Sequence, residues 1–339
     1  MQLLEPWVFL RLLAGIVASA LLVRASVTAI QVLRRFDVMR ATEGQLLLER
    51  RVELAGTFVR VGAAAQVVAL LLSALSADKL SRGIRGAMCA YGAFNSSPWG
   101  FRSLYASVLA ALAAGTLAQL YTFDARIKTM ELVRPLAWAT LLVAPLALVD
   151  LALQTAFVLD LDLSVVASCC SVQLDPIASA RGGTVGGPRV AATAAAAIGV
   201  GVCILLAWLV ARRPTRPKVA LASAVAFASL PLAIAAIVLE IAPYTFEVPQ
   251  HHCPFCLLRA DAWGLGYPLF GALLLAAVWS FGAGASALLA RKPQVAEAWQ
   301  RFAASRLRRG ALAWGAFALL CLVPVVRYAL VSHGASLFP

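Results

Sequence analysis

Long apolar stretches, separated by short polar segments, follow one another along the chain. Each is close to the roughly 20 residues that a helix needs to cross a bilayer. We therefore predict an all-α integral membrane protein with eight transmembrane helices, and no connecting segment is long enough for a separate soluble domain. The predicted spans are 7–30, 53–76, 100–121, 135–158, 190–211, 219–241, 264–290 and 311–331.

Composition supports the same class. Hydrophobic residues make up 62% of the 339 residues and charged residues 13%. Soluble domains are about 45–50% apolar and about 25% charged, so we exclude a soluble enzyme and a secreted domain. The net charge of +13 would suggest nucleic acid as a partner of a soluble protein. For a membrane protein we expect no nucleic-acid partner and a lipid bilayer instead.

The basic residues concentrate in alternate connectors. One set of connectors holds 18 cationic residues and the other holds six. The positive-inside rule assigns the first set to the cytoplasm, so both termini are predicted to lie outside. The first set is Arg34, Arg35, Arg40, Arg50, Arg51, Arg126, Lys128, Arg134, Arg212, Arg213, Arg216, Lys218, Arg291, Lys292, Arg301, Arg306, Arg308 and Arg309; the second is Lys79, Arg82, Arg85, Arg181, Arg189 and Arg259.

Two of the basic segments, 34–52 and 291–309, also contain apolar residues. We interpret them as ordinary basic connectors. The alternative is that they form helical extensions of the neighbouring spans or helices that lie in the membrane interface.

Two of the outer loops resemble each other. Cys89 is followed by an aromatic residue at Tyr91 and by Trp99-Gly100, and Cys253 is followed by Phe255 and Trp263-Gly264. The offset that aligns the two loops also superposes the second and third spans on the sixth and seventh. We predict two parallel four-helix repeats, 1–165 and 166–339, related by an axis along the membrane normal.

The seven cysteines are distributed unevenly. Cys203 and Cys321 lie within spans, where a small apolar packing residue is the simplest interpretation. The other five lie in outer loops or at helix mouths. We expect the bacterial cytoplasmic (inner) membrane, whose outer, periplasmic side is oxidising, so these five can form disulfides.

Cys253-Pro-Phe-Cys256 is a C-x-x-C motif preceded by His251 and His252. Three interpretations are open. A nearby cation such as Arg259 would lower the thiolate pKa and speed thiol–disulfide exchange. The pair can instead form a structural disulfide. The two histidines and two cysteines also offer nitrogen and sulfur ligands for copper or zinc.

Cys169-Cys170 lies in the longest outer loop, between the fourth and fifth spans. Neighbouring cysteines bridge each other only with strain. We therefore expect each to face another cysteine, such as Cys89, Cys253 or Cys256, either in a thiol relay or as a link between the two halves.

A C-x-x-C at the outer face of a four-helix membrane bundle, with a second cysteine pair in an outer loop, resembles disulfide bond formation protein B and the vitamin K epoxide reductase group. Those proteins pass electrons from thiols to a quinone. The resemblance implies that Cys253 and Cys256 are the quinone-proximal pair, and that Cys169 and Cys170 act as the shuttle. It also implies that Arg259 matches the arginine that follows the cysteine pair in the B-type proteins. We predict Arg259 and Trp263 as the residues that would bind a quinone.

Two acidic residues, Asp150 and Glu240, lie within or at the end of spans. Buried charges in a bilayer are expensive and often functional. We expect them to pair with Arg11 or Arg327; proton handling for quinone reduction, or cation binding, is the alternative.

The sequence thus predicts a membrane thiol–disulfide oxidoreductase or accessory redox protein acting at the outer face. Its partner would be a periplasmic thiol protein or a membrane complex subunit. The alternative is a non-enzymatic membrane protein whose outer cysteines are structural or bind a soft metal, and which serves in assembly, metal delivery or transport.

Overall fold

The computed structural model describes residues 5–37, 42–127, 130–162, 186–290 and 293–338. The described part of the chain contains eight helices that are long and apolar enough to cross a membrane, and it contains no strand. The protein is therefore a helical, multi-pass membrane protein. The long helices are α1 (Pro6–Arg35), α2 (Glu43–Ser81), α4 (Gly100–Asp124), α5 (Val133–Asp160), α7 (Gly186–Arg212), α8 (Arg216–Ala236), α10 (Gly266–Leu289) and α11 (Ala296–Val331).

Short helical elements connect these long helices. They are α3 (Ala90–Asn95), η2 (Met130–Leu132), the π-helical turn η3 (Ile237–Ile241), α9 (Ala242–Phe246), η4 (Pro254–Leu258), η5 (Ala260–Ala262) and η6 (Pro293–Val295). The turn η3 continues α8 into α9, so the sixth predicted span becomes one helical rod from Arg216 to Phe246.

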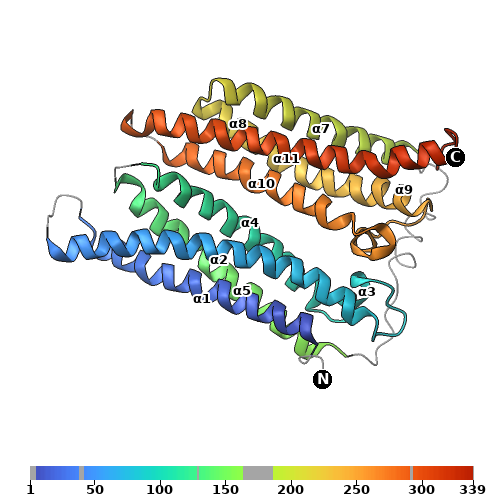
Figure 1. Ribbon diagram of the computed structural model, residues 1–339, viewed down its shortest axis with the longest axis horizontal. Helices are drawn as coiled ribbons and strands as arrows, with labels where there is room; N and C mark the ends of the chain where they lie inside the picture. Colours follow the sequence, from blue (N-terminus) through green and yellow to red (C-terminus); the bar gives the residue numbers. More distant parts are fainter. Residues whose placement is uncertain (1–4, 38–41, 128–129, 163–185, 291–292, 339) are drawn as a thin grey trace.

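The helices form two groups of four that lie side by side (Figure 1). In the first group α1 packs on α2, α2 on α4, α4 on α5, and α5 returns to α1. In the second group α7, α8, α10 and α11 make the same closed circuit of contacts. The two groups meet along α4 and α10, so the third long helix of each group forms the contact between them.

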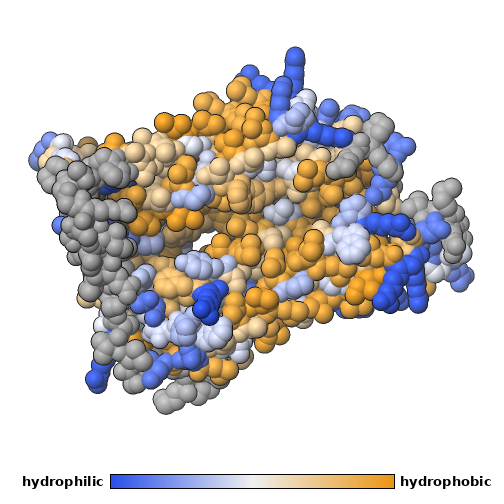
Figure 2. Space-filling view, turned by 180° about the vertical axis from the view of Figure 1, so that it is seen from behind, coloured by the Kyte–Doolittle hydropathy of each residue, from blue (hydrophilic) through white to orange (hydrophobic). Residues whose placement is uncertain are grey.

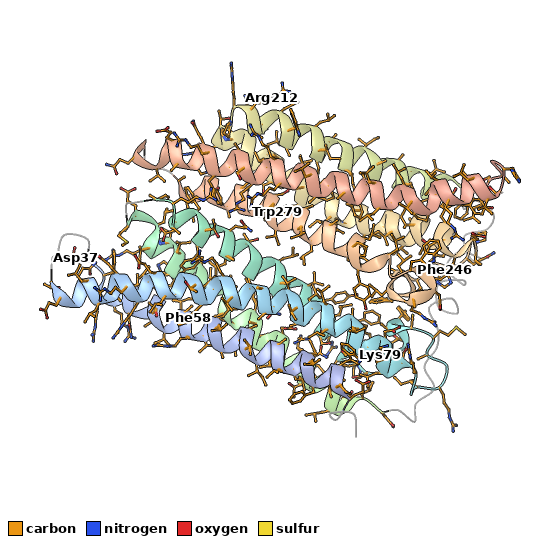
Figure 3. All side chains as sticks on the ribbon, in the orientation of Figure 1. Asp37, Phe58, Lys79, Arg212, Phe246 and Trp279 are labelled. Atoms are coloured by element: carbon orange, nitrogen blue, oxygen red, sulfur yellow. The ribbon has the colours of Figure 1, made fainter. Side chains whose placement is uncertain are left out.

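The chain termini lie at the same end of the helices (Figure 1). The loop that holds α3 is also at this end, and Lys79 and Phe246 mark it in Figure 3, whereas Asp37 lies at the opposite end. We call the end with the termini the α3 end. On the face seen in Figure 2, hydrophobic residues cover the middle and hydrophilic residues gather toward the two ends, as lipid contact requires.

Two of the basic segments are helical, contrary to the interpretation as ordinary connectors. Residues 43–52 belong to α2 and residues 296–309 belong to α11, so both are extensions of spans. Local chemistry explains the beginning of α2, because the Thr42 hydroxyl accepts a hydrogen bond from the amide of Gln45. In α11 the side chains of Trp299 and Phe302 are buried, which fixes the extension against the bundle.

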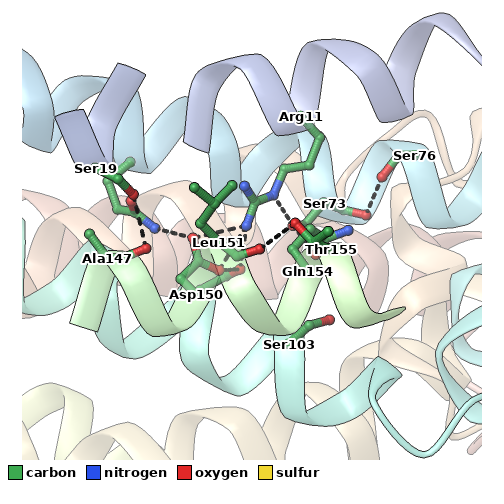
Figure 4. Close-up of polar contacts among 12 residues, drawn as sticks. Arg11, Ser19, Ser73, Ser76, Ser103, Ala147, Asp150, Leu151, Gln154 and Thr155 are labelled. Atoms are coloured by element: carbon green, nitrogen blue, oxygen red, sulfur yellow. Dashed lines mark hydrogen bonds and ion pairs between the residues drawn. The ribbon is translucent and has the colours of Figure 1, made fainter. Parts of the chain in front are cut away.

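The core of the first group is polar at the level of Arg11. Its guanidinium pairs with the Asp150 carboxylate at 2.7 Å, and neither side chain has any exposed surface. Arg11 also donates to the Ser73 and Ser107 hydroxyls, and Gln66 donates to Asp150 at 2.6 Å. Figure 4 shows Arg11 of α1 beside Ser73 of α2 and Asp150 of α5. Burial is tolerated because each charge has an opposite charge and further hydrogen bonds.

The second group contains an apolar cluster of buried side chains in its core. Side chains of Val200, Leu273, Trp314 and Phe317 fill it, together with Cys203. The interpretation of Cys203 as a packing residue is therefore confirmed, and Cys321 packs against the same cluster.

The predicted pairing of the intramembrane acids is half right. Asp150 pairs with Arg11 as expected, but Glu240 pairs with Arg189 at 2.7 Å. Arg327 pairs with Glu247 instead. The difference arises because α8 continues through η3 and presents Glu240 to the first turns of α7.

Candidate functional site: a three-cysteine cluster

The loop between α2 and α4 presents Cys89 at the start of a short helix. After α2 ends at Ser81, the chain turns back, and Cys89 takes an extended conformation as the N-cap of α3. Ala90, Ala93 and Phe94 of α3 are buried against the end of α2 and the end of α5. This packing fixes the α3 helix, and with it the direction of the Cys89 side chain.

The second loop of the site, between α9 and α10, presents Cys253 and Cys256 on one helical turn. Glu247 ends α9 in a left-handed conformation, and Cys253 is the N-cap of η4. Pro254 occupies the first position of that turn, where its fixed φ angle favours helix and its missing N–H group has no cost. The C-x-x-C motif therefore lies on a tight 3-10 turn, ahead of α10.

The three cysteines meet at one point. The Sγ atoms of Cys89 and Cys253 are 3.4 Å apart, and those of Cys89, Cys253 and Cys256 all lie within 4.8 Å of one another. The residues are 1%, 0% and 5% exposed. Two loops from different halves of the chain thus bring their matching cysteines into direct contact, and we call this group the three-cysteine cluster.

Aromatic side chains surround the cluster. Phe255, which lies between the two cysteines of the motif, reaches across to the first group of helices. Its ring centroid is 5.8 Å from that of Phe94 and 6.2 Å from those of Tyr91 and Phe101. These are ordinary distances for packed aromatic rings. Phe255 therefore fixes η4 against the first group, and the sulfur atoms lie in an apolar, aromatic environment.

The two histidines next to the motif have different surroundings. The His251 ring packs on Phe246 with centroids 4.2 Å apart, and its Nε2 atom is buried with no hydrogen-bond partner among the described residues. The His252 Nδ1 atom lies 3.2 Å from the Val238 carbonyl oxygen. Among the described residues, the potential metal ligands that lie within 4.8 Å of one another are the three cysteines. The sequence predicted His251 and His252 as ligands beside the C-x-x-C motif, whereas the structure places Cys89 there.

Burial lowers the pKa of His251, and His252 acts in the same direction while Cys89 opposes it. The unfolded chain takes up a proton near the ordinary pKa of 6.5, whereas the folded protein does so only at lower pH. The unfolded state thus binds more protons below about pH 6.5, and stability falls as the pH drops below that value. We expect the thermal unfolding midpoint to fall between pH 7.5 and pH 5, and to fall less in His251→Phe.

The same substitution at an exposed histidine, His333→Phe, controls for the chemical change itself. If the unfolding midpoint depends on pH in the same way in wild type and in His251→Phe, then His251 is not the residue that lowers the stability at low pH.

Arg259 contacts the loop of Cys89, and Trp263 contacts α11. Arg259 donates to the Met88 carbonyl at 2.8 Å and pairs with Asp261. Trp263 is 64% exposed, and the Arg327 guanidinium lies 4.6 Å from its ring centroid. Arg259 therefore connects the second loop to the residue before Cys89. Contact of either residue with a quinone stays a prediction.

The repeated Trp-Gly pair has a different structure in each loop. Trp99 is the N-cap of α4, and Gly100 is its first residue. Trp263 and Gly264 have φ angles of 52° and 63°, so α10 begins only at Gly266. This left-handed turn is the reason that the seventh span begins two residues later than predicted.

Cys169 and Cys170 lie outside the described residues. The proposed contact between this pair and the three-cysteine cluster therefore stays a prediction. Sequence reasoning gave Cys89 a secondary part in the site, whereas the structure makes it a central member. The matched positions of Cys89 and Cys253 indicated that the two residues are equivalent, and the packing of the two loops brings them into contact.

The chain matches no known protein family, no characterised protein and no solved structure. The comparisons therefore add nothing for or against the resemblance to quinone-linked disulfide-forming membrane proteins. Any function has to be argued from the chemistry of the three-cysteine cluster and its position in the fold.

Proposed function

We propose that the protein is a thiol–disulfide redox protein of the bacterial cytoplasmic membrane, with the three-cysteine cluster as its redox centre. The observation that carries the proposal is the meeting of three buried sulfur atoms from two distant loops. A structural disulfide uses two cysteines, whereas a third sulfur within reach provides an exchange partner.

The topology that we propose has the α3 end outside and both termini on that side. The positive-inside rule supports it, because the connectors at the opposite end carry most of the loop arginines and lysines. The cluster then faces the periplasm, which is an oxidising compartment.

We also propose that the two groups of helices are repeats. Their identical circuit of helix contacts supports this, as does the contact between the matching helices α4 and α10. A second sequence match supports it further. Arg189 follows Arg11 at the same interval at which the pair Arg212-Arg213 follows the pair Arg34-Arg35. Both Arg11 and Arg189 pair with an acid near the α3 end.

The reaction that we propose is the oxidation of two thiols to a disulfide. Two electrons and two protons leave the sulfur atoms, and a membrane-soluble quinone accepts them. A thiol protein on the outer side then reduces the centre again and becomes oxidised itself. The aromatic, apolar environment of the cluster suits a flat apolar acceptor, and burial of the sulfurs protects them from unspecific exchange.

The test is a thiol count on the full-length protein in lipid nanodiscs. After anaerobic reduction, a short-chain benzoquinone should oxidise two cysteines per protein, which is measured by maleimide labelling after denaturation. Cys253→Ser should abolish this oxidation. Cys203→Ser, at a buried cysteine of α7 outside the cluster, is the matched control and should behave like wild type. Unchanged thiols in wild type would refute the proposal.

Soft-metal binding is the second candidate function. The sulfur atoms within 4.8 Å of one another support it, and the buried His251 Nε2 atom next to the motif offers a further donor. Thiolates in this number suit Cu(I) or zinc. One equivalent of either metal in anaerobically purified protein, lost in Cys89→Ser and kept in Cys203→Ser, together with thiols inert to quinone, would favour this function.

A further inference from the structure

The three-cysteine cluster joins the two groups of helices at a single point. Cys89 belongs to the first group of helices through α3, and Cys253 and Cys256 belong to the second group through η4. The sulfur that lies against the C-x-x-C motif therefore comes from the other half of the molecule.

We infer that Cys89 is an exchange residue, which converts the Cys253–Cys256 disulfide into a Cys89–Cys253 disulfide and back. This inference rests on the proposed redox function and adds a residue to it. In the forward step the Cys89 thiolate attacks the Cys253 Sγ atom, and the Cys89–Cys253 bond forms as the Cys253–Cys256 bond breaks. The electron pair leaves with the Cys256 Sγ atom, which takes up the proton that Cys89 lost. No external oxidant or reductant is needed.

We expect Cys253 to be the sulfur that is attacked. Its Sγ atom is 3.4 Å from that of Cys89, which is close to van der Waals contact, so a small movement brings the two into reaction. Thiol–disulfide exchange requires an approach of the attacking sulfur to one sulfur of the disulfide. The short α3 helix and the 3-10 turn of η4 hold the two cysteines in this arrangement from opposite sides.

Cys256 is the sulfur that is released, because it is bonded to Cys253 in the disulfide that Cys89 attacks. It is 5% exposed, whereas Cys89 and Cys253 are 1% and 0% exposed. The exchange thus moves the disulfide to Cys89 and Cys253 and leaves the reduced thiol on Cys256, and all three residues are buried. It also creates a covalent bond between the two groups of helices, which the Cys253–Cys256 disulfide lacks.

Disulfide mapping on the full-length protein tests the inference. Trypsin cleavage after Arg85 and Arg102 places Cys89 on the peptide 86–102, and cleavage after Lys218 and Arg259 places Cys253 and Cys256 together on the peptide 219–259. The protein in nanodiscs is equilibrated in glutathione buffers of graded redox potential, quenched with acid and alkylated. In wild type we expect both the internally bridged peptide 219–259 and its cross-link to 86–102.

Three variants separate the sulfur atoms. In Cys256→Ser the cross-linked pair should replace the internal bridge entirely, and in Cys89→Ser the internal bridge should form alone. Cys321→Ser, outside the cluster, should keep the wild-type mixture. Wild-type mapping requires no substitution, so misfolding of a variant leaves the test intact.

The two proposals fail in different ways. If quinone oxidises the Cys253–Cys256 pair while the peptide 86–102 never cross-links at any potential, the exchange inference is wrong and the redox function stands. If the glutathione buffers produce both disulfides but quinone oxidises neither pair, exchange stands and the quinone-linked function fails.

Discussion

Replacing Asp150 with alanine is expected to destabilise the folded protein by about 3–5 kcal/mol, because the substitution leaves the Arg11 guanidinium buried without its counter-charge. Asp150 accepts hydrogen bonds from Arg11, from Gln66 and from the Ser107 hydroxyl. These donors lie on α1, α2 and α4, so the substitution removes hydrogen bonds that join α5 to each of the other three long helices of the first group. Equilibrium unfolding in mixed micelles of increasing denaturing detergent measures the change.

Asp261→Ala is the matched control. Its partner Arg259 and Asp261 itself are both partly exposed, and exposed ion pairs contribute about 0–1 kcal/mol. A double substitution, Arg11→Met with Asp150→Leu, should recover most of the stability, because it removes both charges from the core. A loss below about 1 kcal/mol for Asp150→Ala would show that the pair adds little to folding.

Substituting Gly100 with alanine should disrupt the loop that holds α3 and the three-cysteine cluster together. A Cβ atom at this position would lie 2.0 Å from the Phe94 carbonyl oxygen, and backbone cannot yield as a flexible side chain can. The end of α3 therefore has to move away from α4. We expect a loss of about 1–3 kcal/mol, which is typical of overpacking, and fewer cross-links between Cys89 and the C-x-x-C motif. Thermal unfolding and disulfide mapping measure the two effects.

Gly271→Ala provides the comparison. Gly271 lies in α10, and a Cβ atom there meets nothing within 4 Å. The same chemical change should leave stability unchanged or raise it slightly, since alanine reduces the freedom of the unfolded chain. If both alanine variants behave alike, the close approach of α3 to α4 does not constrain the loop.

Hydropathy predicted the eight helices because the bilayer imposes one length and one composition on every span. It could not place the ends of α2 and α11. The basic extension of α11, for example, is stabilised by packing of Trp299 and Phe302, which no local pattern reveals. The beginning of α10 was misplaced because left-handed Trp263 is set by the tertiary structure of the loop.

For the cysteines, too, the sequence predicted one property and missed another. The matched loops predicted that Cys89 and Cys253 are equivalent, but a repeat says nothing about distance. Their contact depends on the packing of α4 against α10 and on the insertion of Phe255 among aromatic residues of the first group. The polar partners of Asp150 were also hidden, because Gln66 and Ser107 look ordinary within their apolar stretches.

The buried ion pair of the first group has a consequence for biosynthesis. Asp150 follows Arg11 by 139 residues, so the ribosome delivers the positive charge to the membrane well before the negative one. Until the fourth long helix arrives, α1 carries an unneutralised arginine, whose stable position is near the lipid headgroups. The folded position of α1 therefore depends on α5, which supplies the counter-charge of Arg11.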